Sequence, residues 1–160
     1  MYLGNQFRTI SSLVCMVSKV WPKLQFPEAA LRMRNHDSAT QVFDIIRKSW
    51  FVLAPEEYVR QQLIHHLVND LRYPPNNMAV EKQLVINNRK KRFDLLVMNR
   101  NGQPLMIIEC KAPNVALTQE AFNQVAFYNF PIQAPWVMIT NGLTTHTAKL
   151  DLETKQFSFV

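Results

Sequence analysis

The spacing of apolar residues between positions 55 and 71 predicts an amphipathic helix. Pro55 suits the first turn of a helix, and Glu56 and Glu57 complement the positive end of the helix dipole there. The Pro-Pro and Asn-Asn pairs that follow Tyr73 end the pattern. The apolar stripe of this helix consists of Val59, Leu63, Ile64, Leu67, Val68 and Leu71.

Short apolar runs bounded by turn residues predict the strands of a sheet. A β-type pair is expected over residues 43–53, with its turn at Arg47-Lys48, after an extended lead-in over residues 22–42. Thr118 is expected to cap a second helix over residues 119–129. Further strands are predicted at residues 78–86, 92–98, 104–111, 136–140, 144–148 and 156–160. This order of elements favours an α/β domain with a central mixed sheet flanked by helices.

The Asn101-Gly102 pair between two apolar runs is the strongest short-range hairpin signal in the chain. A two-residue loop there places Asp94 directly opposite Glu109, and Lys111 shares their face because side chains alternate along a strand. A four-residue loop preserves this pairing, whereas a three-residue loop would shift it by one residue and separate the two carboxylates. The hairpin therefore predicts a pair of opposed acids with a lysine beside them.

Two directly opposed carboxylates destabilise a hairpin unless a cation lies between them. A hard divalent cation such as Mg²⁺, with Mn²⁺ as an alternative, binds one or two carboxylates and keeps several waters. The backbone carbonyl of Cys110 is a further candidate ligand. Lys111 could orient a water molecule and stabilise the charge on a phosphate, so the set of Asp94, Glu109, Cys110 and Lys111 predicts metal-assisted phosphodiester hydrolysis. Each residue alone is more simply a solvated strand residue. The set is favoured as a site because Glu109 and Lys111 end the apolar run 105–108.

Composition adds little to this picture. The 160 residues suggest one domain, and the net charge of +6 favours an anionic partner such as nucleic acid without requiring one. Two cysteines are too few for a disulfide framework, so a cytoplasmic protein is expected. The cluster 89–92 could contact phosphates or form a solvated turn, and His65 and His66 point too far apart on a helix to share an ion.

With these residues in place, the chain resembles a known family. Phe93-Asp94-Leu95 followed by Glu109-Cys110-Lys111-Ala112-Pro113 is similar to the signature of the PD-(D/E)xK nuclease superfamily. More closely, the chain resembles the N-terminal nuclease domain of type I restriction enzyme R subunits, including small stand-alone homologues. The match covers roughly residues 40–142, and four other stretches agree with it. They are residues 43–48, residues 55–61, Gln124 to Asn129, and Thr140-Asn141-Gly142.

The resemblance implies a restriction-endonuclease-like core that cleaves DNA with Mg²⁺. It implies Asp94 and Glu109 as metal ligands and Lys111 as the catalytic lysine. It also implies an acid on the first helix, for which Glu57 is preferred and Glu56 is the close alternative. Gln124 and Tyr128 lie one helical turn apart and are expected to support the site and the DNA.

Other functions stay open at this point. The first alternative is a catalytically silent module that binds DNA or assembles with other subunits of a restriction-modification system. The second is an interaction protein that keeps the fold for stability. The sequence contains no Walker A glycine loop, so translocation is not expected of this chain. Arg72-Tyr73 stands where the family usually has Gly-Tyr, so this turn is expected to differ.

The N-terminal segment stands apart from this pattern. Residues 1–21 are interpreted as an extension, with Met16 as an alternative start, and residues 22–160 as one nuclease-like domain. The apolar stretch 10–21 is interrupted by Lys19 and is too short for a transmembrane helix, so no membrane partner is expected.

Overall fold

The computed structural model describes residues 21–86, 89–151 and 153–160. The interpretation of residues 1–20 as an extension, the start at Met16 included, lies outside the described residues. Helices are α1 (Pro55–His65) and α2 (Gln119–Asn129), with a π-helical turn η1 (His66–Asp70) and a 3-10 turn η2 (Pro75–Asn77). Strands are β1 (Met33–His36), β2 (Ala39–Asp44), β3 (Ser49–Val52), β4 (Met78–Val80), β5 (Gln83–Ile86), β6 (Arg89–Arg92), β7 (Leu95–Met98), β8 (Pro104–Cys110), β9 (Trp136–Thr140), β10 (Thr145–Leu150) and β11 (Phe157–Phe159).

The central sheet has six strands in the order β11-β10-β9-β8-β7-β4. Strands β8 and β9 run parallel, and helix α2 makes the crossover between them, as parallel neighbours require. The other neighbours in this sheet are antiparallel. The predicted α/β class, with a central mixed sheet flanked by helices, is therefore confirmed.

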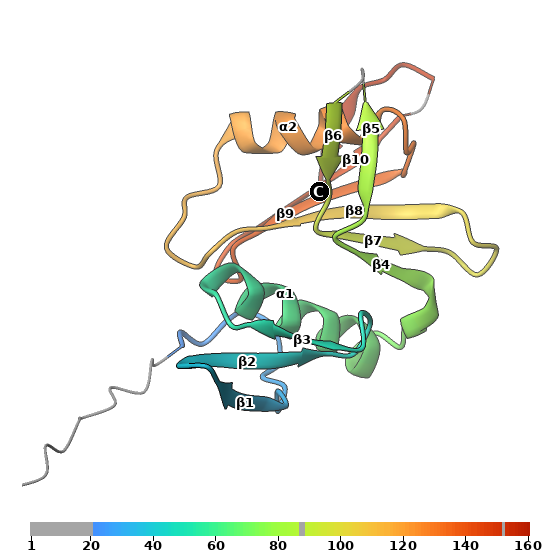
Figure 1. Cartoon of the computed structure of the whole chain (residues 1–160). Coiled ribbons are helices and arrows are strands. Elements are labelled where there is room, and N and C mark those ends of the chain that lie inside the picture. Colours follow the sequence, from blue (N-terminus) through green and yellow to red (C-terminus); the bar gives the residue numbers. More distant parts are fainter. Residues whose placement is uncertain (1–20, 87–88, 152) are drawn as a thin grey trace, which may run out of the picture.

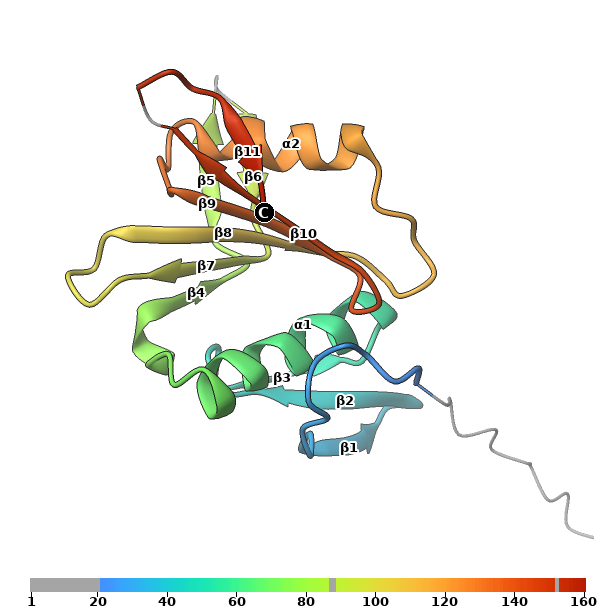
Figure 2. The same cartoon turned by 180° about the vertical axis from the view of Figure 1, so that it is seen from behind.

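Two hydrophobic cores lie on opposite faces of the six-stranded sheet (Figures 1 and 2). One core packs α1 against Leu95, Ile108 and Cys110, and the other packs α2 against Ile107 and Val137. The small sheet β1-β2-β3 covers the far side of α1, so this helix lies between two sheets (Figure 1). Both faces of β8 are covered, which explains its continuous apolar run.

Helix α1 begins at Pro55 as predicted, but its apolar stripe ends earlier than expected. The π-helical turn η1 continues the helix to Asp70, and Leu71, the last member of the predicted stripe, is 53% exposed. A π-helical turn has more residues per turn than an α-helix, so the stripe rotates off the buried face there. Arg72, at the position of the departure from the family pattern, has a φ of +61°.

The lead-in over residues 22–42 is more regular than predicted. It contains β1, which pairs antiparallel with β2, and β2 already begins at Ala39. Asp37 and Ser38 both adopt positive φ and make the tight turn between the two strands. The expected β pair is confirmed as β2 and β3, with Lys48 at positive φ in its turn.

The strand predicted at residues 78–86 is broken into β4 and β5. The strand predicted at residues 92–98 is confirmed as β7, except that Arg92 ends β6, which pairs with β5 in a separate hairpin. Glu81 adopts a φ of +50°, and its N–H donates to the Asp94 carbonyl at 3.0 Å. This bond closes the neck of the hairpin, which stands on the α2 side of the sheet (Figures 1 and 2).

The loop between β7 and β8 has three residues instead of the predicted two. Further along, the two strands pair in the predicted register. Asn99 pairs with Gln103 around the three residues 100–102, with Gly102 at a φ of +75°. A three-residue loop shifts the pairing by one residue, and Met98 accordingly pairs with Pro104. A β-bulge at the next residue, Leu105, then restores the predicted pairing, so that Val97 faces Met106 and Leu95 faces Ile108.

The other predicted elements agree closely with the structure. Thr118 accepts a hydrogen bond from the Ala121 N–H and caps α2, which spans the predicted residues. Strand β9 has the predicted bounds, and both candidate C-terminal strands are present as β10 and β11. Among the described residues, the structure contains no helix that is both long enough and apolar enough to span a membrane.

Candidate metal-dependent active site

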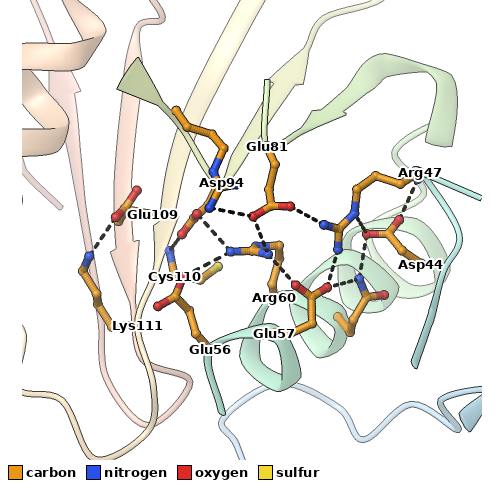
Figure 3. Close-up of polar contacts among 12 residues, drawn as sticks. Asp44, Arg47, Glu56, Glu57, Arg60, Glu81, Asp94, Glu109, Cys110 and Lys111 are labelled. Carbon is orange, nitrogen blue, oxygen red and sulfur yellow. Dashed lines mark hydrogen bonds and ion pairs between the residues drawn. The ribbon is translucent and has the colours of Figure 1, made fainter. Parts of the chain in front are cut away.

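Asp94 lies at a bend one residue before β7, and its carboxylate is buried. The paired residues of β7 and β8 end at Leu95 and Ile108, and Asp94 lies just beyond them, close enough to Glu109 for their charges to interact. The Cys110 N–H donates to Asp94 Oδ2 at 2.7 Å, and Arg60 Nη2 donates to Asp94 Oδ1 at 3.0 Å (Figure 3). The two oxygens of Asp94 are therefore held from two different elements, β8 and α1.

Glu109 lies near the end of β8, and Lys111 directly follows the strand. Lys111 Nζ donates to Glu109 Oε1 at 2.7 Å, and the Lys111 N–H donates to the Thr140 carbonyl of β9. Burial lowers the pKa of Lys111, but its hydrogen bond and ion pair with Glu109, together with the charges of Glu56 and Asp94, raise it by more. Lys111 is therefore a cation at neutral pH, suited to stabilise negative charge.

The pKa of Glu109 reflects the repulsion between two neighbouring acids. Burial raises the pKa of Glu109, the charge of Asp94 raises it further, and the bond from Lys111 lowers it by less. Opposed carboxylates with this electrostatic cost are the hard oxygen ligands that Mg²⁺ or Mn²⁺ prefers.

These ligands fit a cation that keeps several waters better than one enclosed by protein. In residues 21–86, 89–151 and 153–160, no three His, Cys, Asp or Glu side chains are placed to hold a metal by themselves. Mg²⁺ is commonly held by one or two carboxylates and its own waters, so Asp94 and Glu109 fit it. The Cys110 carbonyl as a third ligand stays a prediction.

The two candidate acids of α1 have different surroundings. Glu57 is buried and binds Arg47, Arg60 and Gln61 (Figure 3). Glu56 is half exposed, and its pKa is raised by burial and then by the charge of Asp94. Glu56 also acts electrostatically on Glu109 and Lys111. The structure thus brings Glu56, the alternative candidate, toward the predicted site, and places the preferred Glu57 within the arginine cluster.

A buried cluster of charges behind Asp94 escaped the sequence analysis (Figure 3). Arg47 binds Asp44, Glu57 and Glu81, and Arg60 binds Asp94, Glu56 and Glu57 and lies near Glu81. Burial lowers the pKa of Arg60, but Asp94 and the neighbouring acids raise it by more. A signal for this cluster was present, because Arg60 lies one turn before Ile64 on the apolar face of α1.

Gln124 and Tyr128 are on one side of α2, as their spacing predicts. Gln124 Nε2 donates to Tyr128 Oη at 2.8 Å, and Gln124 is exposed while Tyr128 is half-buried. Their contact with DNA and their support of the carboxylates stay predictions.

The Thr140-Asn141-Gly142 stretch fixes the loop that follows Lys111. Asn141 accepts bonds from the N–H groups of Leu143 and Thr144, and its amide donates to the Val115 carbonyl at 2.9 Å. Gly142 has a φ of +81°, and a Cβ there would lie 2.7 Å from a methyl carbon of Leu24.

Three other features were considered in the sequence. Burial raises the pKa of the Cys110 thiol well above its ordinary value, so it is not a nucleophile. His66 stacks on Phe26 and pairs with Asp70, while His65 lies against Asn69. In the cluster 89–92, Arg92 is exposed and pairs with Glu81.

Comparison with known proteins extends these findings. Residues 55–160 match the sequence model of the type I restriction enzyme R protein N terminus. Three chains of solved structures match. One is a fragment described as an HsdR subunit of a type I restriction enzyme from Vibrio vulnificus YJ016, 17% identical with a TM-score of 0.43. The match covers 58% of the chain described here and 20% of that chain. The comparison with curated proteins finds no match.

Proposed function

Because the chain belongs to the family of type I restriction enzyme R protein N termini, we propose that it is a metal-dependent DNA endonuclease domain. The observation that carries the proposal is the closeness of Asp94 to Glu109, with Asp94 bonded to the Cys110 N–H and Lys111 bonded to Glu109. Opposed acids that cost electrostatic energy, together with a protonated lysine, favour a site for a divalent cation and a phosphate.

In this proposal each residue has a separate task. Asp94 and Glu109 would hold Mg²⁺ or Mn²⁺, which would supply Lewis acidity and lower the pKa of a bound water for the hydrolysis of a phosphodiester. Lys111 carries its positive charge toward the phosphate, where a fixed donor stabilises the charge that develops in the transition state. Because the raised pKa keeps Lys111 protonated at neutral pH, Lys111 acts as a cationic hydrogen-bond donor that positions the water. It does not act as the general base that takes a proton from the water.

Other residues complete the site in the proposal. Glu56 extends the acidic surface from α1 because it acts electrostatically on both Asp94 and Lys111, and Glu57 supports it from within the arginine cluster. Gln124 and Tyr128 contact the DNA from α2. Other subunits of a restriction-modification system are the expected partners, since the family is that of the N termini of type I restriction enzyme R proteins.

A second candidate function is a catalytically silent module that binds DNA or assembles with other subunits. One observation favours it: both oxygens of Asp94 already accept bonds from the protein, and Lys111 is paired with Glu109. A site neutralised in this way could keep the fold without holding a metal.

DNA cleavage separates the two candidates. Supercoiled plasmid and circular single-stranded DNA are incubated with the wild-type chain in Mg²⁺, in Mn²⁺ and in EDTA. The endonuclease proposal predicts metal-dependent nicking that Lys111→Ala reduces by about 10²–10³-fold. Lys149→Ala serves as the matched control because Lys149 is exposed on β10. Equal cleavage by wild type and Lys111→Ala overturns the proposal, and binding that persists in EDTA without cleavage supports the silent module.

A further inference from the structure

Arg60 is the residue of the buried cluster that reaches Asp94. Its side chain is 3% exposed, and its Nη2 lies 3.0 Å from Asp94 Oδ1 and 3.2 Å from Glu56 Oε1. Its Nη1 binds Glu57 and lies 3.5 Å from Glu81. One guanidinium thus connects the acid before β7 to both acids at the start of α1 (Figure 3).

This arrangement is costly for a residue that serves stability alone. Burying a guanidinium carries a large desolvation penalty, and an apolar side chain on the same face of α1 would avoid it. In addition, Arg60 Nε is buried and has no hydrogen-bond partner among the described residues. Buried polar atoms that are left unsatisfied mark positions where a geometry is kept for another reason.

The geometry of Asp94 supplies that reason. Asp94 lies at a bend, outside the paired residues of β7, at the neck where the β5–β6 hairpin leaves the central sheet. Its carboxylate is held at Oδ2 by the Cys110 N–H and at Oδ1 by Arg60. One donor at each oxygen, from two separate elements, fixes both the rotamer and the plane of the carboxylate.

We propose that Arg60 is a positioning residue, which holds the carboxylate of Asp94 in the orientation a metal ligand needs and beside Glu56. The task assigned to Asp94 rests on the function proposed above. The positioning itself concerns the contacts of Arg60 with Asp94 alone, so it is testable without a metal.

The alternative is that Arg60 only neutralises the surrounding acids. The two roles predict opposite effects of removing the charge. If the guanidinium only neutralises the acids, it weakens their attraction for a cation, so Arg60→Met would bind Mn²⁺ more tightly. If the guanidinium positions Asp94, it improves cation binding, so Arg60→Met would bind Mn²⁺ more weakly.

Amide hydrogen exchange at Cys110 tests the positioning directly. The variants are Arg60→Lys, which keeps the charge but not the forked donors, and Arg47→Lys. Arg47→Lys is the matched control because Arg47 also binds Glu57 and Glu81. We expect the Cys110 amide hydrogen to exchange at least about tenfold faster in Arg60→Lys than in wild type. In Arg47→Lys we expect it to exchange at nearly the wild-type rate. Equal exchange in wild type and Arg60→Lys overturns the proposal.

A measurement on the wild-type chain covers the case in which Arg60→Lys does not fold. An Arg60 side chain bonded at both Nη atoms gives separate, slowly exchanging NMR signals for its Nη protons, because rotation about the Nε–Cζ and Cζ–Nη bonds is blocked. A single averaged signal for these protons contradicts the proposal.

Mn²⁺ titration of wild type, Arg60→Lys and Arg60→Met then shows what the positioning serves. We expect weaker binding in both variants, by about tenfold or more. Tighter binding in Arg60→Met contradicts the positioning role. If the wild-type chain neither binds Mn²⁺ nor cleaves DNA, the proposed function fails, and the Cys110 amide and the Arg60 signals still decide the role of Arg60.

Discussion

Asp94 Oδ2 accepts a hydrogen bond of 2.7 Å from the backbone N–H of Cys110, the residue between Glu109 and Lys111. This bond joins β8 to the bend before β7 through a side chain, at the point where the backbone ladder between the two strands ends. The orientation of the first acid therefore depends on the backbone that carries the other two residues of the predicted site.

Asp94→Asn should lower the free energy of unfolding by about 3 kcal/mol, because it breaks a buried ion pair and leaves Arg60 one acid short. An amide can accept one of the two bonds that Asp94 accepts, but its NH₂ group then faces the other donor. Urea unfolding measures the loss. Asp37→Asn is the control, since the Asp37 side chain is 88% exposed, and a change within about 0.5 kcal/mol is expected for it. Equal stability of Asp94→Asn and wild type would falsify this account of the bond.

Glu109→Gln should have the opposite effect and stabilise the fold at neutral pH. Burial and the charge of Asp94 raise the pKa of Glu109 above its ordinary value of 4.5. A carboxyl with a raised folded pKa contributes stability below its unfolded pKa, and this contribution is lost as pH rises through the folded pKa. The charged form therefore costs stability at pH 7, and glutamine removes that cost while still accepting the bond from Lys111.

The sign of this effect is checked by urea unfolding between pH 3 and pH 8. The gain from Glu109→Gln should be largest near neutrality and shrink as pH falls through the folded pKa of Glu109. A Glu109→Gln variant that is less stable than wild type at pH 7 would contradict the repulsion between Asp94 and Glu109.

Alanine at the two turn glycines tests the turn geometry. Gly102 has a φ of +75° and open space around it, so Gly102→Ala should cost about 1 kcal/mol from backbone conformation alone. Gly142→Ala should cost more, because a φ of +81° is combined with a contact of 2.7 Å to Leu24. Thermal unfolding of both variants measures the difference. The same loss in both would mean that the Leu24 contact relaxes at no cost.

Asn141→Ala should destabilise the loop after Lys111 by about 2–3 kcal/mol, because the Leu143 and Thr144 N–H groups and the Val115 carbonyl lose their partner. Limited proteolysis should then cut within residues 112–118 faster than in wild type. The exposed Asn123→Ala serves as the control. Unchanged cleavage of this loop in Asn141→Ala would show that Val115 is held by other contacts.

The sequence predicted what depends on local patterns. The bounds of α2 and β9 and the closeness of Asp94 to Glu109 follow from helical spacing, capping and the hairpin signal. The two-residue turn was wrong, and its register holds because the bulge at Leu105 compensates the three-residue loop. An apolar pattern cannot reveal two irregularities that cancel.

Ion pairs between residues far apart in the sequence were harder to predict than local structure. No local pattern pointed to the contacts of Arg60 and Glu81, because their partners Asp94 and Arg92 lie 34 and 11 positions away. The predicted strand breaks at Glu81, where φ is +50°. Charges buried in a network are visible only when the fold brings the partners together.

The central claim is that Asp94 and Glu109 together hold a divalent cation. The most direct test is a titration of Mn²⁺ into wild type, Glu109→Gln and the exposed control Glu153→Gln. Binding is measured by electron paramagnetic resonance as the loss of the signal of unbound Mn²⁺. The account predicts that wild type and Glu153→Gln bind Mn²⁺ alike. It predicts that Glu109→Gln binds Mn²⁺ at least about tenfold more weakly than wild type. Equal affinity of wild type and Glu109→Gln would contradict it.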